Sequence, residues 1–318
     1  MKKNTQLLTA LSAALISFLT SVSSYAAIQT WVASTGSGNT CSLAAPCNSL
    51  RIAYDATDQG GVINLLDSGN FGVVQISRSI TLRAVGVDAG ATINDQGDES
   101  STWITVSAGA ADVVTLEGLH LNGDGGVDFL SGKQLNVIKC VITNASGDVM
   151  NAGIRFEPTS VSKLSVTDTV ITNMGSGTGG GIIVNPQGSG GAQVALERVT
   201  INGNAFGIAA DGSSSTGGIN MTIADSMIAN NARDGIIATT SSGGAPIGVY
   251  VKDTKSVNNA FGIRSAGTNV TVRVDGSSVI GNVTGLSFSG GGVLATYGNN
   301  AVNANAANGA FSGSIPLQ

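Results

Sequence analysis

The chain has 318 residues, a formal net charge of −5, 11% charged residues, 4% aromatic residues and 45 glycines. Phosphate backbones are bound by clustered Lys and Arg, so an acidic chain with dispersed basic residues predicts no nucleic-acid partner. With five prolines, the glycine content is not that of collagen or of a disordered linker. It indicates a β-rich protein with many tight turns.

The first 26 residues are typical of a signal peptide. Lys2 and Lys3 form the charged start, an apolar stretch runs from Leu7 to Leu19, and residues 24–26 (Ser-Tyr-Ala) suit signal peptidase. The segment holds two of the 15 basic residues and none of the 20 acidic ones, so a mature chain from Ala27 has a net charge of −7. The apolar stretch is shorter than the roughly 20 residues of a membrane span. We therefore expect an exported protein, periplasmic or extracellular, with no membrane span in the mature chain.

Three cysteines follow the signal peptide. Cys41 and Cys47 flank a tight Ser-Leu-Ala-Ala-Pro segment, and in an oxidising compartment we expect them to form a disulfide. Cys140 stands at an inward-facing position of the repeat described below, which predicts a buried free thiol.

A short helix is predicted between Asn48 and Thr57, because Leu50, Ala53 and Tyr54 fall on one helical face. Such a helix would cap the open end of a solenoid and shield its edge strands. Residues 27–60 are then an N-terminal cap, residues 61–300 the solenoid and residues 301–318 a loose closing segment. The Trp residues at 31 and 103 are expected in the cap and the core.

One short sequence motif recurs seven times between Leu116 and Val293. Its central residue, usually aliphatic, returns every 21 to 30 residues, at Leu121, Ile142, Ile171, Ile201, Ile228, Ser256 and Val279. Aliphatic residues stand five and seven positions before each of these, and this period of two is typical of strands with one buried face. Asn-rich corners follow in two adjacent registers, with Asn144, Asn173, Asn230 and Asn258 in one and Asn204, Asn231, Asn259 and Asn282 in the next.

After each corner comes a second inward pair, such as Ile154 with Phe156 or Leu286 with Phe288. Each repeat thus holds about three short strands, and Gly-Asn corners would break helices of similar length. In stacked coils each strand pairs with its equivalent in the next repeat. This arrangement satisfies the hydrogen-bonding groups of the backbone and buries one column of aliphatic side chains. The sequence therefore predicts an all-β fold, a single-stranded parallel β-helix.

The opening Trp-Val-Ala-Ser-Thr-Gly-Ser-Gly-Asn-Thr-Cys (31–41) to Ala-Pro-Cys (45–47), followed by Gly-Gly-Val-Ile-Asn-Leu-Leu-Asp-Ser-Gly-Asn-Phe-Gly (60–72), resembles exported bacterial right-handed parallel β-helix proteins of the pectate-lyase-like superfamily. The resemblance extends from Ile28 to about Phe288. It implies a right-handed β-helix. Many relatives cleave, epimerise or bind polysaccharides and others are adhesins or surface proteins, so it implies a tendency in function and no single activity.

Enzyme signatures of that superfamily are not matched. A polygalacturonase-like hydrolase has paired aspartates and Gly-His-Gly, whereas His120, the single histidine, lies in Gly-Leu-His-Leu-Asn-Gly. A calcium-dependent lyase clusters acidic ligands with an Arg or Lys base, and this pattern is not evident either.

The candidate catalytic residues are Asp124, Asp128 and Arg155, and the candidate ligand-binding residues are His120, Asp128 and Arg155. Asp128 and Arg155 occupy equivalent outward positions of neighbouring coils, so their side chains should lie side by side. An exposed ion pair, worth about 0 to 1 kcal/mol, is the simpler interpretation.

Two further features are interpreted as structural. A charged ladder precedes the central residues by three positions, at Lys139, Asp168, Arg198, Asp225 and Asp253, and the alternating signs of its first four members suit stacked side chains. Loops rich in Gly, Ser and Thr, at 188–192, 211–218 and 239–245, should project from one corner as flexible spacers, with a rim for glycans as the alternative.

The sequence thus predicts a non-catalytic, polysaccharide-associated binding or surface protein, a monomer without a cofactor. The first alternative is a polysaccharide lyase or related carbohydrate enzyme, which could require Ca²⁺. The second is an adhesin or envelope scaffold.

Overall fold

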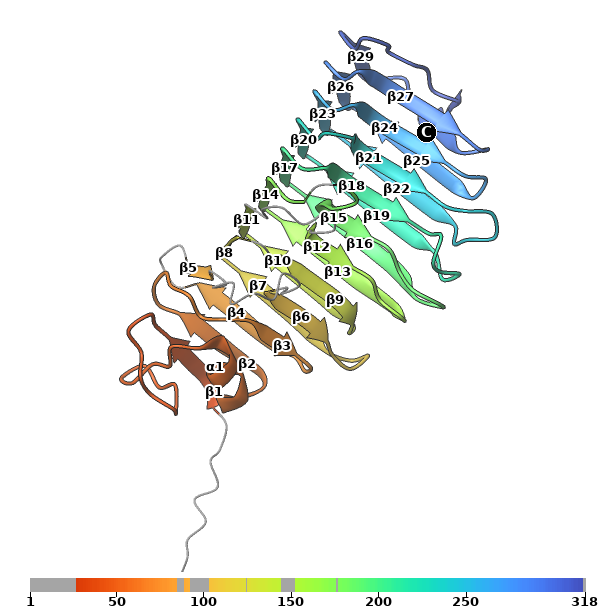
Figure 1. The fold of residues 1–318 in the computed structure, drawn as a ribbon. Coiled ribbons are helices and arrows are strands. Elements are labelled where there is room, and N and C mark those ends of the chain that lie inside the picture. The colour runs from red at the N-terminus through yellow and green to blue at the C-terminus, as the bar shows by residue number, and fades with distance from the viewer. Residues whose placement is uncertain are drawn as a thin grey trace, which may run out of the picture.

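The computed structural model describes residues 27–84, 89–91, 103–123, 125–143, 152–175 and 177–316. Within them the chain forms a right-handed parallel β-helix of three sheets, and the coils are stacked from β1 and α1 at one end to the C-terminus at the other (Figure 1). The predicted fold class is confirmed. The predicted signal peptide, Asp124 and Asn144 lie outside the described residues.

Sheet 1 contains twelve described strands in the order β1 (Ala27–Val32), β2 (Thr57–Leu65), β4 (Ile80–Ala84), β7 (Val113–Glu117), β10 (Gln134–Ile138), β13 (Val161–Thr167), β16 (Gly191–Glu197), β19 (Ile219–Ala224), β22 (Ile247–Lys252), β25 (Val270–Asp275), β28 (Val293–Thr296) and β30 (Gly313–Ser314).

Sheets 2 and 3 contain nine described strands each. Sheet 2 consists of β5 (Ala89–Ala91), β8 (Leu119–Asn122), β11 (Val141–Thr143), β14 (Val170–Thr172), β17 (Thr200–Asn202), β20 (Met227–Ala229), β23 (Lys255–Val257), β26 (Ser278–Ile280) and β29 (Ala301–Asn303). Sheet 3 consists of β3 (Val74–Ile76), β6 (Ile104–Ser107), β9 (Val127–Ser131), β12 (Ala152–Phe156), β15 (Gly180–Val184), β18 (Phe206–Asp211), β21 (Asp234–Thr239), β24 (Phe261–Ala266) and β27 (Thr284–Ser289).

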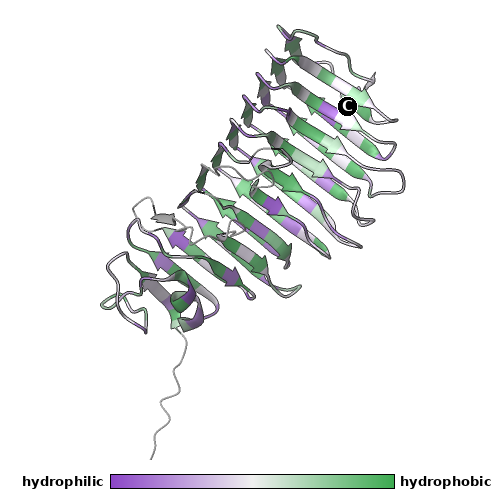
Figure 2. Cartoon of the chain, viewed as in Figure 1, coloured by the Kyte–Doolittle hydropathy of each residue, from purple (hydrophilic) through white to green (hydrophobic). Residues whose placement is uncertain are grey.

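The strand register follows the repeat. The seven central residues pair in one unbroken row of sheet 2, from Leu121 to Val279, and Val302 of β29 extends the row by one coil. The aliphatic residues five and seven positions upstream pair in the same way in sheet 1. Hydrophilic and hydrophobic residues alternate along the strands (Figure 2), because successive side chains point into and out of the coil.

The apolar interior holds the inward aliphatic residues together with Trp103 and the stacked rings of Phe129 and Phe156, whose centroids are 4.6 Å apart. Cys140 is a buried free thiol as predicted, and burial raises its pKa to about 11. Phe288 is an exception, since 46% of it is exposed although it was predicted to face inward. It lies on β27, the last strand of sheet 3, where no further strand of that sheet covers it.

The two Asn registers have different roles. Asn173, Asn230 and Asn258 have φ between 54° and 56°, the left-handed conformation that Asn tolerates. The residues of the next register are buried and form a hydrogen-bonded ladder inside the corner: the backbone N–H and the side-chain amide of each donate to the Oδ1 of the next, through Asn204, Asn231, Asn259, Asn282 and Asn305. At the last coil, Asn308 Oδ1 accepts from Asn305 and ends the ladder.

The charged ladder stands at a second left-handed bend. Lys139, Asp168, Arg198, Asp225 and Asp253 all have φ between 48° and 52°. Arg198 Nε lies 2.6 Å from Asp168 Oδ1, and this hydrogen bond, with help from Lys139, holds the pKa of Asp168 below its ordinary value.

The predicted helix is present as α1 (Leu50–Ala56), and its buried residues are Leu50, Ala53 and Tyr54. Arg78 lies with its guanidinium carbon 3.8 Å from the centre of the Tyr54 ring and donates to the backbone oxygens of Tyr54 and Thr57. These contacts fix the end of α1 against the first coils.

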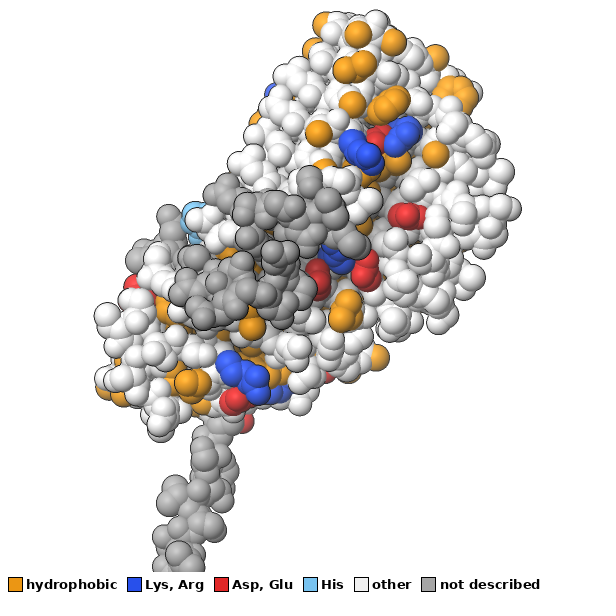
Figure 3. All heavy atoms as spheres, in the orientation of Figure 1, with side chains coloured by type: hydrophobic (Ala, Val, Ile, Leu, Met, Phe, Trp, Pro, Cys, Tyr) orange, Lys and Arg blue, Asp and Glu red, His pale blue; other side chains and the backbone are white. Residues whose placement is uncertain are grey.

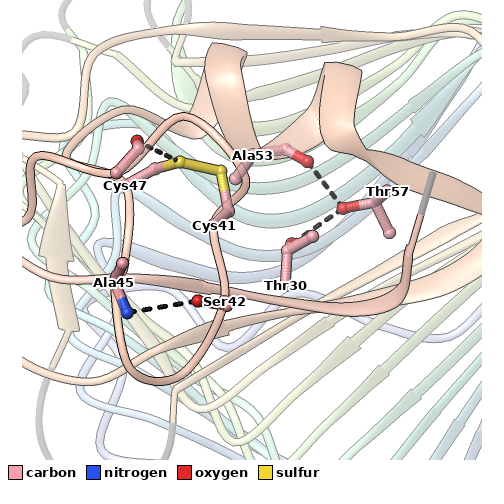
Figure 4. The surroundings of a disulfide bond; sticks show 8 residues. Thr30, Cys41, Ser42, Ala45, Cys47, Ala53 and Thr57 are labelled. Atoms are coloured by element: carbon pink, nitrogen blue, oxygen red, sulfur yellow. Dashed lines mark hydrogen bonds between the residues drawn. A yellow bond between two sulfur atoms is a disulfide. The ribbon is translucent and has the colours of Figure 1, made fainter. Parts of the chain in front are cut away.

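A disulfide joins Cys41 and Cys47 beside α1 (Figure 4), as predicted. The loop that it closes covers the free edge of β1: Trp31 N–H donates to Cys41 O at 2.8 Å, and Cys47 N–H donates to Trp31 O at 3.0 Å. An edge strand is thereby protected from pairing with another chain.

Candidate functional site

The structure brings Asp128 and Arg155 together. They are paired residues of β9 and β12 on the outer face of sheet 3, and Arg155 Nε lies 3.6 Å from Asp128 Oδ1. Glu157, which the sequence analysis missed, lies with Oε1 3.8 Å from Arg155 Nη1. Its position two residues after Arg155, on the same face of the chain, was the available signal.

The electrostatics of this cluster resemble those of a surface ion-pair network. Burial raises the pKa of the Glu157 carboxyl, the nearby Asp128 raises it too, and Arg155 opposes both. His120 lies on β8 of sheet 2, so the structure does not bring it to the pair on sheet 3. Figure 3 shows acidic and basic side chains in separate groups along the face in view, with no single continuous charged patch.

A groove of about 640 Å³ crosses the outer face of sheet 1, from β10 to β25. Its outward side chains are amides, hydroxyls and two cations: Gln134, Lys163, Ser165, Gln193, Asn220, Thr222, Tyr250 and Arg273. No Asp or Glu is among the described residues that line it.

Strand register places these side chains in two parallel rows. Gln134, Lys163, Gln193 and Asn220 pair in succession, and so do Ser165, Ala195, Thr222, Tyr250 and Arg273. Neighbouring strands are about 4.8 Å apart, so Lys163 and Arg273 are separated by four steps, or about 19 Å. The groove therefore offers a repeated set of hydrogen-bonding groups along the solenoid axis.

The two cations are available to a ligand. Both are exposed, and neither forms an ion pair with another residue in the described part of the chain. Guanidinium and ammonium groups bind carboxylates by charge-assisted hydrogen bonds.

Tyr250 is held in place at one end of the groove. Its hydroxyl donates to Asp275 Oδ2 at 2.5 Å, which raises the pKa of Tyr250 to about 12 and lowers that of Asp275. Tyr297 packs edge-on against the ring, with 6.2 Å between centroids. The fixed, half-buried ring offers a flat apolar surface beside Arg273.

The Gly, Ser and Thr loops do project from one corner, between sheets 3 and 1, but hydrogen bonds join each to the next. Gly188 N–H donates to Ser214 O and Ala245 N–H donates to Gly212 O, both at 2.9 Å. Ser215, which is buried, donates to Gly190 O. In the structure these loops form a stacked layer, in contrast to the flexible spacers that their composition predicted.

No three His, Cys, Asp or Glu side chains gather into a metal-binding group within the described ranges. No described helix is long and apolar enough to cross a membrane.

Comparison with known proteins finds similarity to a solved structure, with no match to a family model or a curated protein. Among solved structures, the chain is similar to the pectate lyase Pel9A, with 16% sequence identity and a TM-score of 0.36, over 86% of this chain and 70% of that one.

Proposed function

We propose that this chain is an exported protein that binds a polysaccharide in the sheet 1 groove without cleaving it. The observation that supports the proposal most is the groove itself, because it is open, elongated and lined by side chains that hydrogen-bond to hydroxyl groups. An extended polymer fits such a surface better than a compact small molecule, which prefers a more enclosed and apolar pocket.

The ligand class follows from the charges. Lys163 and Arg273 favour a polysaccharide that carries carboxylates, and the amides of Gln193 and Asn220 between them suit sugar hydroxyls. Neither the contacts to carboxylates nor the contacts to hydroxyl groups require a metal ion, so we expect binding to be unchanged by a chelator. Export is supported by the Cys41–Cys47 disulfide, since such bonds persist in oxidising compartments.

The test compares the two candidate sites. Binding to a panel of acidic and neutral polysaccharides is measured for the wild type, for Gln193→Ala/Asn220→Ala in the groove and for Asp128→Ala/Arg155→Ala on sheet 3. We expect the groove variant to lose about thirtyfold in affinity, since each of the two lost hydrogen bonds contributes about 1 kcal/mol, and the sheet 3 variant to bind normally. Loss confined to the sheet 3 variant would contradict the assignment of the groove.

The alternatives have their own readouts in the same experiment. A lyase would release unsaturated uronate products, which absorb in the ultraviolet, from at least one acidic polymer. An adhesin or scaffold would bind no polysaccharide and would cofractionate with the cell envelope.

A further inference from the structure

Two guanidinium groups of sheet 3 lie over aromatic rings. The guanidinium carbon of Arg233 lies 5.2 Å from the centre of the Phe206 ring, and that of Arg264 lies 4.8 Å from the centre of the Phe261 ring. Phe206 and Phe261 are the first residues of β18 and β24, and Asp234 is the first residue of β21 between them. Because neighbouring strands are about 4.8 Å apart, the two Arg–Phe pairs form one cluster, about two coils high.

Asp234 fixes the position of Arg264. Its side chain is 2% exposed, Arg264 Nε lies 2.6 Å from its Oδ1, and Arg264 Nη2 donates to its Oδ2 at 2.6 Å. Burying a carboxylate for a single ion pair contributes little to stability, because the loss of hydration offsets the attraction. What the pair does provide is orientation: the guanidinium is planar, so with Nε and Nη2 turned to Asp234 its Nη1 points away from that carboxylate.

Both cations keep hydrogen-bond donors for a ligand. Arg233 is exposed, and within the described ranges it forms no ion pair. The Phe206 ring covers one face of its guanidinium and leaves the N–H groups at the edge. Burial raises the pKa of Asp234, and the charges of Arg264 and then Arg233 oppose this rise, so both guanidiniums act on the same carboxylate.

The surroundings of the cluster are uncharged. Two rows of equivalent residues cross it from β15 to β27, and neither row has a charged member other than Asp234 and Arg264. The first row holds Gly180, Phe206, Asp234, Phe261 and Thr284, and the second holds Ile183, Ala209, Ile237, Arg264 and Ser287. With Arg233, two guanidiniums and one carboxylate leave a net charge of +1, in an apolar setting that strengthens hydrogen bonds to an anion.

We propose that Arg233 and Arg264 form a second ligand site, which binds carboxylate or sulfate groups of an acidic polysaccharide. Guanidinium groups bind such oxoanions by charge-assisted, often bidentate, hydrogen bonds. A single exposed ion pair contributes little, so a ligand with several anionic groups suits two cations on neighbouring coils. The proposal rests on the proposed function for the ligand class, but it shares no side chain with the sheet 1 groove.

The test is isothermal titration calorimetry with polygalacturonate, which carries carboxylates, and with dextran sulfate, which carries sulfates. Every measurement uses a background chain with Lys163→Ala and Arg273→Ala, so that the cations of the groove do not contribute. We expect this chain to bind at least one of the two polymers, and more weakly as salt is added. Adding Arg233→Gln should lower the affinity about tenfold or more, because charge-assisted hydrogen bonds are lost.

A second variant tests Arg264 without leaving a buried charge unpaired. Arg264→Gln is combined with Asp234→Asn, and we expect a loss of similar size. Arg198→Ala is the matched control, because its exposed guanidinium is already paired with Asp168 and Glu197, and the affinity should not change. Neutral dextran, which lacks the sulfates, should not bind, and circular dichroism checks that every variant is folded.

Four results would overturn the second site. These are a background chain that binds neither polymer, Arg233→Gln that binds like the background chain, Arg198→Ala that loses as much affinity as Arg233→Gln, and neutral dextran that binds as tightly as dextran sulfate. The groove is tested separately, by Gln193→Ala with Asn220→Ala in the otherwise wild-type chain, so a failure of one proposal is distinct from a failure of the other.

Discussion

Gly207 belongs to a column of glycines at one position of the coil, just before the inward aliphatic residue of sheet 3: Gly153, Gly181, Gly207, Gly235, Gly262 and Gly285. A Cβ at Gly207 would lie 2.4 Å from Gly235 O and 2.5 Å from Ile228 Cγ2. The backbone of the next coil and the Ile228 side chain of sheet 2 therefore leave no space for a side chain at position 207.

Replacing Gly207 by Ala should lower the free energy of unfolding by about 1 to 3 kcal/mol, because the packed coils must move apart. Urea unfolding measures the change. Gly248→Ala is the control, since its nearest contact would be the Asn220 side chain at 3.4 Å, and we expect less than about 1 kcal/mol there. Equal effects of the two substitutions would contradict the packing argument.

The two neighbouring asparagines of one corner make a second comparison. Asn259→Ala removes the acceptor of the Asn231 N–H and amide, which stay buried, whereas Asn258→Ala affects an exposed residue with φ of 55°. We expect a loss of about 2 kcal/mol or more for Asn259 and about 1 kcal/mol for Asn258. Thermal unfolding of both variants measures these losses. A larger loss for Asn258→Ala than for Asn259→Ala would contradict the view that the buried ladder contributes more stability than the exposed Asn register.

Between elements, Asp112 connects the first coils. Its carboxylate accepts from the Ser79 hydroxyl at 2.7 Å, from the backbone N–H groups of Ser79 and Gly109, and from the Gln59 amide at 3.1 Å. The hydrogen bond from Ser79 is the main reason that the pKa of Asp112 is lowered from its ordinary value of 3.8. The loops before β4 and β7 are thus fixed to β2 by one charge.

Because the folded pKa lies below the unfolded one, the stabilisation by Asp112 is complete above about pH 4 and is lost as the pH falls through the folded pKa. We expect Asp112→Asn to be less stable than the wild type at neutral pH and to lose less stability on acidification. Urea unfolding at several pH values between 3 and 7 measures this, at roughly one point per pH unit. Asp55→Asn, at an exposed position of α1, serves as the control.

The elements also show what the sequence could predict. Strand register was predictable because one slipped residue would turn every aliphatic side chain of a coil outward, so the buried rows are strongly patterned. The burial of the second Asn register was not recognised, since a polar residue at a turn is usually interpreted as exposed. The groove was missed because its members, such as Gln193, Asn220 and Tyr250, share a face without sharing a residue type.

Each coil of the solenoid contacts only its neighbouring coils, so the coil at either end has a neighbour on one side only and needs a cap. At the N-terminal end, the Cys41–Cys47 loop and α1 cover β1. At the C-terminal end, β29 and β30 add strands to sheets 2 and 1, within the segment 301–318 that was expected to be loose.

Replacing Cys41 and Cys47 together by Ser should cost about 2 kcal/mol, the entropy of closing a short loop. The freed edge of β1 should also increase self-association, because it offers unpaired backbone groups. Calorimetry and light scattering measure the two effects. A reductant should change the wild type in the same direction and leave the variant unchanged, and an unaltered melting temperature in the variant would contradict a stabilising role.

The repeating hydrogen bonds of the Asn ladder would allow the solenoid to be lengthened by whole coils. Asn231 accepts from Asn204 the same two hydrogen bonds that it donates to Asn259. The 27 residues from Asn204 to residue 230 therefore form one repeating module of the solenoid. Duplicating residues 204–230 would insert one strand into each sheet and extend the surface of sheet 1 by about 4.8 Å. Gene duplication can therefore lengthen the outer surface of sheet 1, and with it the proposed polysaccharide groove, without any change to the interior or to either terminus.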